Sequence, residues 1–285
     1  MNLEAIQQRQ FAPVEHHLTR RDTMLYALGL GYGSDPLNAA QLKFVYEEGL
    51  QAVPSIVNVI AHPGFWAREP ELGIDWLRLL HGEQSFQIHR PVPVEGLIRG
   101  EFRIDAVQDL GADKGAKVYQ TKRLYDVQSG DLIATLGTVL FLRGDGGQGG
   151  FGDVPPQPEP LPERAPDLSA SFPTLPQQAL IYRLSGDYNP IHADPAAASK
   201  GGFPAPILHG LCSLGFATRA ILQECAGNDP VRLKSLSLRF SKPVFPGETL
   251  AVEIFREGAG RFSFRCRVPE RDVIVLDRGR AEVSP

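Results

Sequence analysis

The chain has 285 residues, 42% of them hydrophobic and 22% charged, with a formal net charge of −4. This composition is ordinary for a globular protein with one large or two small domains, and the acidic balance gives no basic surface for nucleic acid or an anionic membrane. No apolar run approaches the roughly 18 residues that a membrane-spanning helix needs, and the polar N-terminus does not resemble a signal peptide.

The cysteines point to a reducing compartment. Cys212, Cys225 and Cys266 are odd in number and scattered, so they form neither a CxxC pair nor a disulfide framework. We therefore expect free, mostly buried thiols and a cytoplasmic location.

The first half places helical segments before strands. Residues 39–48 and 53–61 are expected helices, the second bounded by Pro54 and Pro63. Alternating apolar residues then predict strands at residues 84–89, 97–107, 117–127 and 132–142.

A linker divides the chain. Residues 144–152 are rich in glycine and prolines recur as far as Pro173, so neither a helix nor a central strand is compatible with this stretch. The predicted organisation is an N-terminal half at residues 1–143, a linker at 144–173 and a C-terminal half at 174–285.

The second half repeats the order of helices and strands. Asp194-Pro195 begins a short helix that ends at Gly201-Gly202, and an apolar stripe at helical spacing follows over residues 207–222. Strands are expected at residues 249–255, 261–268, 273–276 and 279–283. Arg90-Pro91-Val92 and Lys242-Pro243-Val244 each lead into strands, so the two halves look like duplicated units with a sheet wrapped around a helix.

The most informative stretch is Tyr182-Arg183-Leu184-Ser185-Gly186-Asp187-Tyr188-Asn189-Pro190-Ile191-His192. It places a carboxylate, a carboxamide and an imidazole in irregular backbone, and an Asp with a His suits proton transfer near neutral pH. Because Gly-Asp-x-Asn-Pro is also good turn chemistry, an ordinary surface turn is equally compatible. Ser185 lacks the glycines of a nucleophile elbow, so a serine triad is not favoured.

Gly210 lies where the longer helix is expected to begin. Main-chain N–H groups at a helix start are unpaired and can hold a developing oxyanion. A glycine chosen for close packing is the alternative explanation. The remaining histidines have no metal-ligand spacing with Cys, Asp or Glu, so no metal is predicted.

The segment at residues 182–192, with Pro206-Ile207-Leu208-His209-Gly210-Leu211-Cys212, resembles the hydratase-2 motif of the MaoC-like, (R)-specific 2-enoyl-CoA hydratase family. The likeness extends over nearly the whole chain. Shorter pieces similar to the hydratase unit of peroxisomal multifunctional enzyme type 2 are Phe44-Val45-Tyr46-Glu47, Leu80-His81-Gly82-Glu83-Gln84 and Arg239-Phe240-Ser241-Lys242-Pro243-Val244.

This resemblance implies an α+β double hot-dog fold, with two antiparallel sheets that each wrap around a long helix. Only the second half carries the signature, so the first half is expected to accommodate the acyl chain instead of performing chemistry. The implied reaction is reversible hydration of a trans-2-enoyl-CoA to a (3R)-3-hydroxyacyl-CoA, without cofactor or metal. The implied partners are an acyl-CoA thioester and a second copy of the chain in a homodimer.

The resemblance also assigns residues. Asp187 and His192 would activate the water and move its proton, Asn189 would orient it, and Glu47 would be needed for activity. Substrate-contacting positions would be His81, Gly82, Lys114, Tyr188, Pro190, Ile191, Gly210 and Phe240. Three alternatives remain open: a dehydratase acting on acyl-carrier thioesters, a hot-dog thioesterase and a catalytically silent acyl-CoA-binding subunit.

Overall fold

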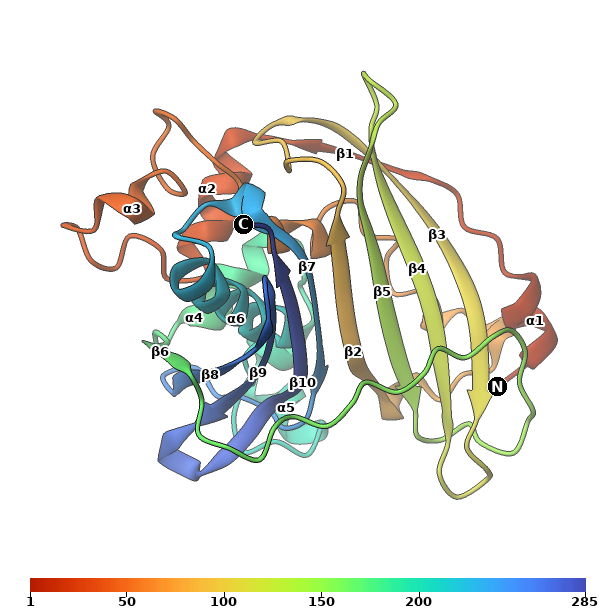
Figure 1. Ribbon diagram of the computed structural model, residues 1–285. Helices are drawn as coiled ribbons and strands as arrows, with labels where there is room; N and C mark the ends of the chain where they lie inside the picture. The colour runs from red at the N-terminus through yellow and green to blue at the C-terminus, as the bar shows by residue number, and fades with distance from the viewer.

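A single antiparallel sheet organises the molecule, and the computed structural model describes residues 1–285 (Figure 1). The sheet has ten strands in the order β1-β3-β4-β5-β2-β7-β10-β9-β8-β6. The N-terminal strands are β1 (Val14–Leu18), β2 (Leu79–Ile88), β3 (Gly96–Asp109), β4 (Ala116–Asp126) and β5 (Leu132–Leu142). The C-terminal strands are β6 (Leu168–Pro173), β7 (Leu233–Phe240), β8 (Thr249–Gly258), β9 (Arg261–Val268) and β10 (Val273–Val283).

The strand order confirms the duplication. Reading outward from the centre, β2-β5-β4-β3-β1 on one side matches β7-β10-β9-β8-β6 on the other. The halves join where β2 pairs with β7, from Glu83 opposite Arg239 to Gln87 opposite Ser235. The expected two sheets are therefore one continuous sheet, because main-chain hydrogen bonds continue across the junction.

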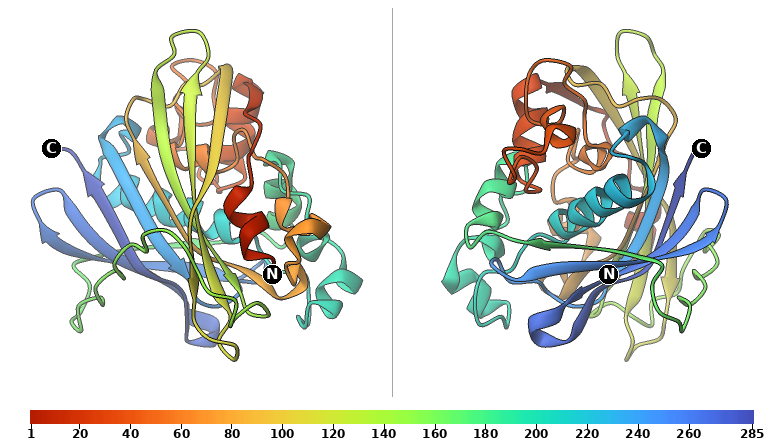
Figure 2. Two further views of the ribbon diagram at one scale, coloured as in Figure 1. Left: turned by 90° about the vertical axis from the view of Figure 1, so that its right-hand side faces the viewer. Right: turned by 60° about the vertical axis from the view of Figure 1, so that its left-hand side comes forward.

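Only the second half contains a long central helix. Helix α6 (Gly210–Cys225) lies in the curve of the C-terminal strands, as the right view of Figure 2 shows. Its residues from Cys212 to Leu222 are all buried, and the hydrophobic ones among them belong to a main core of 45 residues that extends into both halves. The corresponding place in the first half holds a 3-10 helix, η1 (Pro54–Asn58), so the expectation of a long helix in each half was wrong.

The physical reason for this difference lies in how η1 ends. The Lys122 ammonium, which is 8% exposed, donates to the carbonyls of Val57, Asn58 and Ile60 at 2.8, 3.2 and 2.9 Å. These carbonyls therefore do not accept the hydrogen bonds that a continuing helix would supply. The helix expected at residues 39–48 is likewise short, and only α3 (Ala39–Leu42) forms there.

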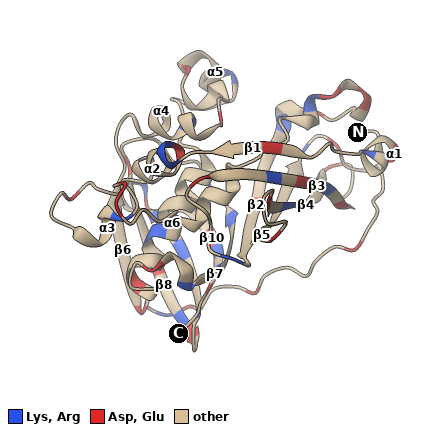
Figure 3. Ribbon diagram, turned by 90° about the horizontal axis from the view of Figure 1, so that it is seen from above, with Lys and Arg blue, Asp and Glu red and all other residues tan.

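The other helices cover the edges and ends of the sheet. They are α1 (Leu3–Gln8), α2 (Arg20–Leu28), η2 (Trp66–Arg68), η3 (Pro70–Leu72), η4 (Trp76–Arg78), α4 (Gln178–Tyr182), η5 (Arg183–Ser185), η6 (Pro190–His192), α5 (Pro195–Lys200), η7 (Pro230–Arg232) and η8 (Pro269–Arg271). No helix combines the length and the apolar character needed to cross a membrane. Basic and acidic residues are mixed along both halves (Figure 3).

The linker crosses the face of the sheet that α6 does not cover (Figure 1). Arg278 donates to the Pro158 carbonyl at 3.2 Å, and Arg280 donates to the Glu159 and Pro160 carbonyls at 2.8 and 3.2 Å. The prolines thus keep the segment extended while the arginines fix it. The last part of the predicted linker belongs to the C-terminal half, because residues 168–173 form β6 and pair with β8.

Candidate active site

The segment at residues 182–192 folds as a series of tight turns beside the start of α6. Gly186 has a φ of 123°, which a side chain would strain. The Asp187 carboxylate then accepts from the Asn189 N–H at 3.1 Å, and the Asn189 side chain caps η6 by accepting from the Ile191 N–H at 3.3 Å. These polar residues therefore build their own turn, which leaves the second oxygen of Asp187 and the amide nitrogen of Asn189 available.

His192 is buried and held in one orientation. Its Nδ1 lies 2.8 Å from the Ile207 carbonyl, and because a carbonyl only accepts, Nδ1 carries the proton. Nε2 is then the unprotonated nitrogen and can accept a proton. Burial lowers the pKa of His192, while the Ile207 bond and Asp187 act in the opposite direction. The structure thus favours a neutral imidazole beside a carboxylate.

His209 completes the cluster, although the sequence analysis gave it no role. Its ring stacks on that of His192 with centroids 3.7 Å apart, and its Nε2 donates to the Asp187 carbonyl at 3.1 Å. Burial and the neighbouring His192 lower its pKa. Its Nδ1 is buried without a partner, so the ring has one committed nitrogen and one free acceptor.

Asp187, His192 and His209 each offer a potential metal ligand, and these atoms lie within 4.8 Å of one another. Sequence spacing did not reveal this grouping. The two rings are stacked with 26° between their planes, so their in-plane lone pairs run nearly side by side instead of converging on one point. This geometry fits proton transfer better than metal coordination.

The position of Gly210 is compatible with both of the roles considered for it. It is the first residue of α6, where main-chain N–H groups have no helical partner. A Cβ at this position would lie 3.1 Å from the Phe240 ring, so the absence of a side chain also permits close packing. A free N–H is thereby presented beside the Asp187 loop, next to an aromatic wall.

The first half supplies the facing wall through β2. The His81 ring contacts Phe240 edge to face at 4.8 Å, and its Nε2 lies 2.9 Å from the Gln84 side-chain oxygen. Gln84 in turn donates to Asn58 at 2.8 Å, which ties the wall to η1. Gly82 lies at an irregularity of the β2–β5 pairing between His81 and Glu83. Desolvation lowers the pKa of His81, whereas its hydrogen bonds with Gln84 and the Glu83 backbone, and then the charge of Asp187, raise it.

The charge of Asp187 also acts on His62, a residue to which sequence reasoning gave no role. Although its ring is partly exposed, the surrounding protein excludes enough water to lower its pKa to about 4, with Lys122 lowering and Asp187 raising it. No local signal identified Lys122, Asn58 or Gln84 either. Asn58 is the last residue of η1, and β2 and β4 bring Gln84 and Lys122 to it from distant parts of the chain.

Other predicted residues lie outside this cluster. Tyr188 and Pro190 are exposed on the loop, and the Arg183 guanidinium lies over the Tyr188 ring at 4.9 Å. Ile191 is half-buried, and its carbonyl accepts from the Ile207 N–H at 3.3 Å. Lys114 is exposed in the β3–β4 turn.

Glu47 is exposed after α3, and its carbonyl accepts from Arg20. Its carboxylate has no partner in the cluster. The role expected for this carboxylate therefore stays a prediction, and an indirect one.

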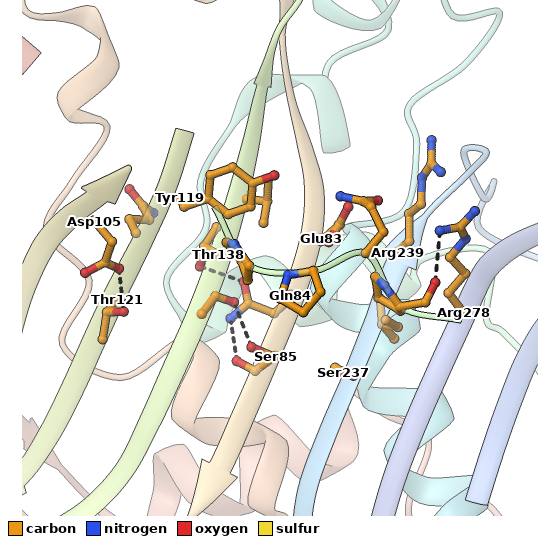
Figure 4. A pocket seen from close by; sticks show the side chains of 18 of the residues that line it. Glu83, Gln84, Ser85, Asp105, Tyr119, Thr121, Thr138, Ser237, Arg239 and Arg278 are labelled. Carbon is orange, nitrogen blue, oxygen red and sulfur yellow. Dashed lines mark hydrogen bonds between the residues drawn. The ribbon is translucent and has the colours of Figure 1, made fainter. Parts of the chain in front are cut away.

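Two cavities flank the junction of the halves. One, of about 160 Å³, is lined mostly by apolar residues, among them Leu25, Ile56 and Val59, and also by Ser185 and Gly186. The other, of about 410 Å³, lies between the linker and the outer face of the sheet (Figure 4). Its lining includes Glu83, Arg239 and Arg278. The apolar cavity is therefore the one beside the segment at residues 182–192.

Comparisons with known proteins agree with this geometry. Residues 16–144 match the family described as MFE-2 hydratase 2 N-terminal domain, and residues 158–276 match the MaoC like domain. A similar protein is 3-hydroxyacyl-thioester dehydratase Y of Mycobacterium tuberculosis, 42% identical over 95% of this chain and 94% of that protein. Enoyl-CoA hydratase 2, peroxisomal, of Arabidopsis thaliana is 38% identical over 90% of this chain and 87% of that protein.

Solved structures support the same fold. A MaoC-like dehydratase from Phytophthora capsici superposes with a TM-score of 0.88 at 35% identity, covering 100% of this chain and 99% of the other. A Mycobacterium tuberculosis protein described as having a double hot-dog fold gives a TM-score of 0.57 at 14% identity, over 97% of this chain and 96% of that one. The double hot-dog architecture expected from the sequence is confirmed.

Proposed function

The chain belongs to the MaoC-like hydratase 2 family, and from this premise we propose that it catalyses the reversible hydration of a trans-2-enoyl-CoA to a (3R)-3-hydroxyacyl-CoA. One observation carries the proposal for the site. The Asp187 carboxylate lies close to the ring of His192, whose Nε2 is unprotonated, and Gly210 begins α6 directly after His209 of the same cluster. The enzyme is a hydro-lyase in this proposal.

The chemistry requires a base, an oxyanion site and a proton donor. A water held by Asp187, Asn189 and His192 attacks C3 of the enoyl thioester and loses a proton to the Asp187–His192 pair. The C2–C3 π electrons move onto the thioester oxygen, which the Gly210 N–H stabilises as an enolate. The pair then returns the proton to C2, which gives the 3-hydroxyacyl thioester with no net change in the protein.

His192 is suited to this exchange because its proton is fixed on Nδ1. The Ile207 carbonyl holds that proton, so Nε2 is free to accept one from water in the first step and to donate it in the second. The free Nδ2 of Asn189 can donate to the water, because its Oδ1 is already used in capping η6. Each side chain thus has one structural bond and one free group.

The dehydratase direction is a second candidate, which the similarity to a 3-hydroxyacyl-thioester dehydratase favours. The same residues serve both directions, because the reverse reaction passes through the same enolate. What differs is the carrier of the acyl group, which is either CoA or the phosphopantetheine arm of a carrier protein.

Purified protein mixed with crotonyl-CoA tests the proposal. Loss of the conjugated-thioester absorbance with formation of (3R)-3-hydroxybutyryl-CoA, identified by chiral analysis, is the expected result. Release of free thiol at the same rate would instead indicate a thioesterase. Binding of crotonyl-CoA with neither product would indicate a silent binding subunit.

The expected homodimer is also a proposal. Sedimentation velocity of the full chain tests it, because a dimer of this 31.2 kDa chain is readily separated from a monomer. A concentration-independent monomer would contradict it.

A further inference from the structure

Two exposed aromatic rings and an arginine form a platform at one end of the N-terminal half. We call the group formed by Phe65, Arg68 and Trp76 the aromatic platform. The rings of Phe65 and Trp76 meet edge to face at 6.2 Å, and the Arg68 guanidinium lies over them at 4.9 and 4.4 Å. Short 3-10 helices, η2 and η4, carry Arg68 and Trp76.

Burial in the core does not explain this arrangement. Phe65 is 45% exposed and Trp76 is 36% exposed, whereas Trp66, the other tryptophan, is 5% exposed and bonded to Gln120. Large aromatic rings left in solvent beside one another are a common mark of a binding surface.

Arg68 has no carboxylate partner. Its neighbours in the same segment are paired, because Arg9 bridges to Glu69 at 2.6 Å and Arg78 bridges to Asp75 at 2.6 Å. The platform therefore presents an unneutralised guanidinium between two π faces. This combination suits a ligand that carries both an aromatic ring and an anion.

Both segments of the platform lead along the chain toward the proposed site. Phe65 follows closely after His62, and Trp76 precedes His81, whose ring contacts Phe240 beside Gly210. The segments lie at the same end of the molecule as α5, which follows the catalytic loop (Figures 1 and 2).

The Lys114 turn connects to the platform as well. A Cβ on Gly146 would lie 2.0 Å from the Gly111 carbonyl oxygen, so the linker passes directly against this turn. A Cβ on Gly144 would lie 2.6 Å from Arg78 of η4 and from Asp75, the residue before η4. Lys114 and Trp76 therefore border the same edge of the N-terminal half.

We propose that the aromatic platform binds the 3′-phosphoadenosine diphosphate end of the CoA thioester. An exposed ring face of the aromatic platform stacks on the adenine base of CoA, and the Arg68 guanidinium pairs with one of its phosphates. This proposal rests on the proposed function and adds a choice of carrier, because a carrier-protein thioester has the pantetheine arm but no adenine. Binding at the platform favours CoA over the carrier-protein substrate.

Truncated substrates test the proposal by kinetics. Trp76→Ala and Arg68→Gln are each expected to lower kcat/KM for crotonyl-CoA at least fivefold and to leave kcat/KM for crotonyl-pantetheine unchanged, since stacking on one base contributes about 1–3 kcal/mol. Arg123→Gln is the matched control, because Arg123 is also exposed and unpaired but lies on β4. Unchanged crotonyl-CoA kinetics, or equal losses on both substrates, would overturn the proposal.

A binding measurement separates this proposal from the proposed reaction. Adenosine 3′,5′-bisphosphate is expected to quench tryptophan fluorescence in the wild type and in Trp66→Phe, and not in Trp76→Phe. The chain has only these two tryptophans, so the signal can be assigned. If the wild-type protein hydrated neither thioester but showed this quenching, the proposed reaction would be refuted and the proposal for the platform would stand. Absence of quenching would refute the platform.

Discussion

His192 and His209 stack face to face with 3.7 Å between ring centroids, and each donates one N–H to a main-chain carbonyl. The His192 bond goes to Ile207 and the His209 bond goes to Asp187. The bond to Ile207 therefore orients His192, the proposed base. The bond from His209 fixes the backbone of Asp187, which carries the neighbouring carboxylate. Neither bond uses the Nε2 of His192, the nitrogen that accepts the proton in the proposed reaction.

Replacing His209 by phenylalanine should separate stacking from hydrogen bonding. Phenylalanine keeps a buried ring against His192 but cannot donate to the Asp187 carbonyl, so kcat should fall roughly tenfold, equivalent to about 1.4 kcal/mol. Steady-state kinetics measures this, and ¹⁵N NMR should show His192 still protonated on Nδ1. His89→Phe is the control, because His89 is exposed and bonded only to Thr135. An unchanged kcat in His209→Phe would show that the Asp187 bond is dispensable.

The pH dependence should reflect the buried neutral histidines. Burial lowers the pKa values of His192 and His209 from the ordinary 6.5, so kcat/KM should stay constant as the pH falls to 6.5 and decline only below it. An acid limb centred above pH 6.5 would contradict a neutral His192 as the base. The measurement is kcat/KM for crotonyl-CoA between pH 4.5 and 8.5.

Stability should depend on pH in the same window. The unfolded chain protonates these histidines near pH 6.5, whereas the folded protein resists protonation until lower pH. The unfolded state thus binds more protons below pH 6.5, and the free energy of unfolding should fall as the pH decreases. Urea titrations at several pH values should show a smaller decrease in His209→Phe, because one of the responsible groups is gone. An equal slope in both proteins would contradict this assignment.

Asp187→Asn and His192→Gln should each lower kcat by about 10²–10⁴-fold, because the base that activates water is lost. Thermal unfolding should change little, since Asp187 is reached by solvent and glutamine can still donate toward the Ile207 carbonyl. Asp194→Asn is the matched control. Asp194 caps α5 by accepting from the Ala196 N–H at 2.8 Å, and asparagine can do the same. Near wild-type kcat in either site variant would remove that residue from the mechanism.

Lys122→Met should destabilise the fold by about 2–4 kcal/mol, because three buried carbonyls at the end of η1 lose their donor. Chemical denaturation measures this loss. Lys234→Met, which removes an exposed lysine with a single bond to the Val231 carbonyl, should change stability by less than about 0.5 kcal/mol. Equal effects would show that the Lys122 bonds contribute little.

Local patterns in the sequence identified much of the fold. Strand β5 has the predicted bounds, because alternating apolar residues and flanking turns lie within one short window. Helix α6 follows from its apolar stripe, although it begins at Gly210, after the expected start. The two strands expected at residues 273–283 are one irregular strand, β10, in which Arg278 has a φ of 51°. Strands β1 and β7 and helix α2 were not predicted.

The sequence alone determined that Asp187, Asn189 and His192 share one irregular loop next to a helix start, because all these signals are local. Only the tertiary structure decided what faces that loop. Pairing of β2 with β7 places His81 against Phe240, and the packing of α6 places His209 on His192. Long-range pairing depends on register and burial across the whole sheet, which no short window of sequence contains. For the same reason, the sequence could not predict that Lys122 of β4 lies beneath η1 and donates to the carbonyls at its end.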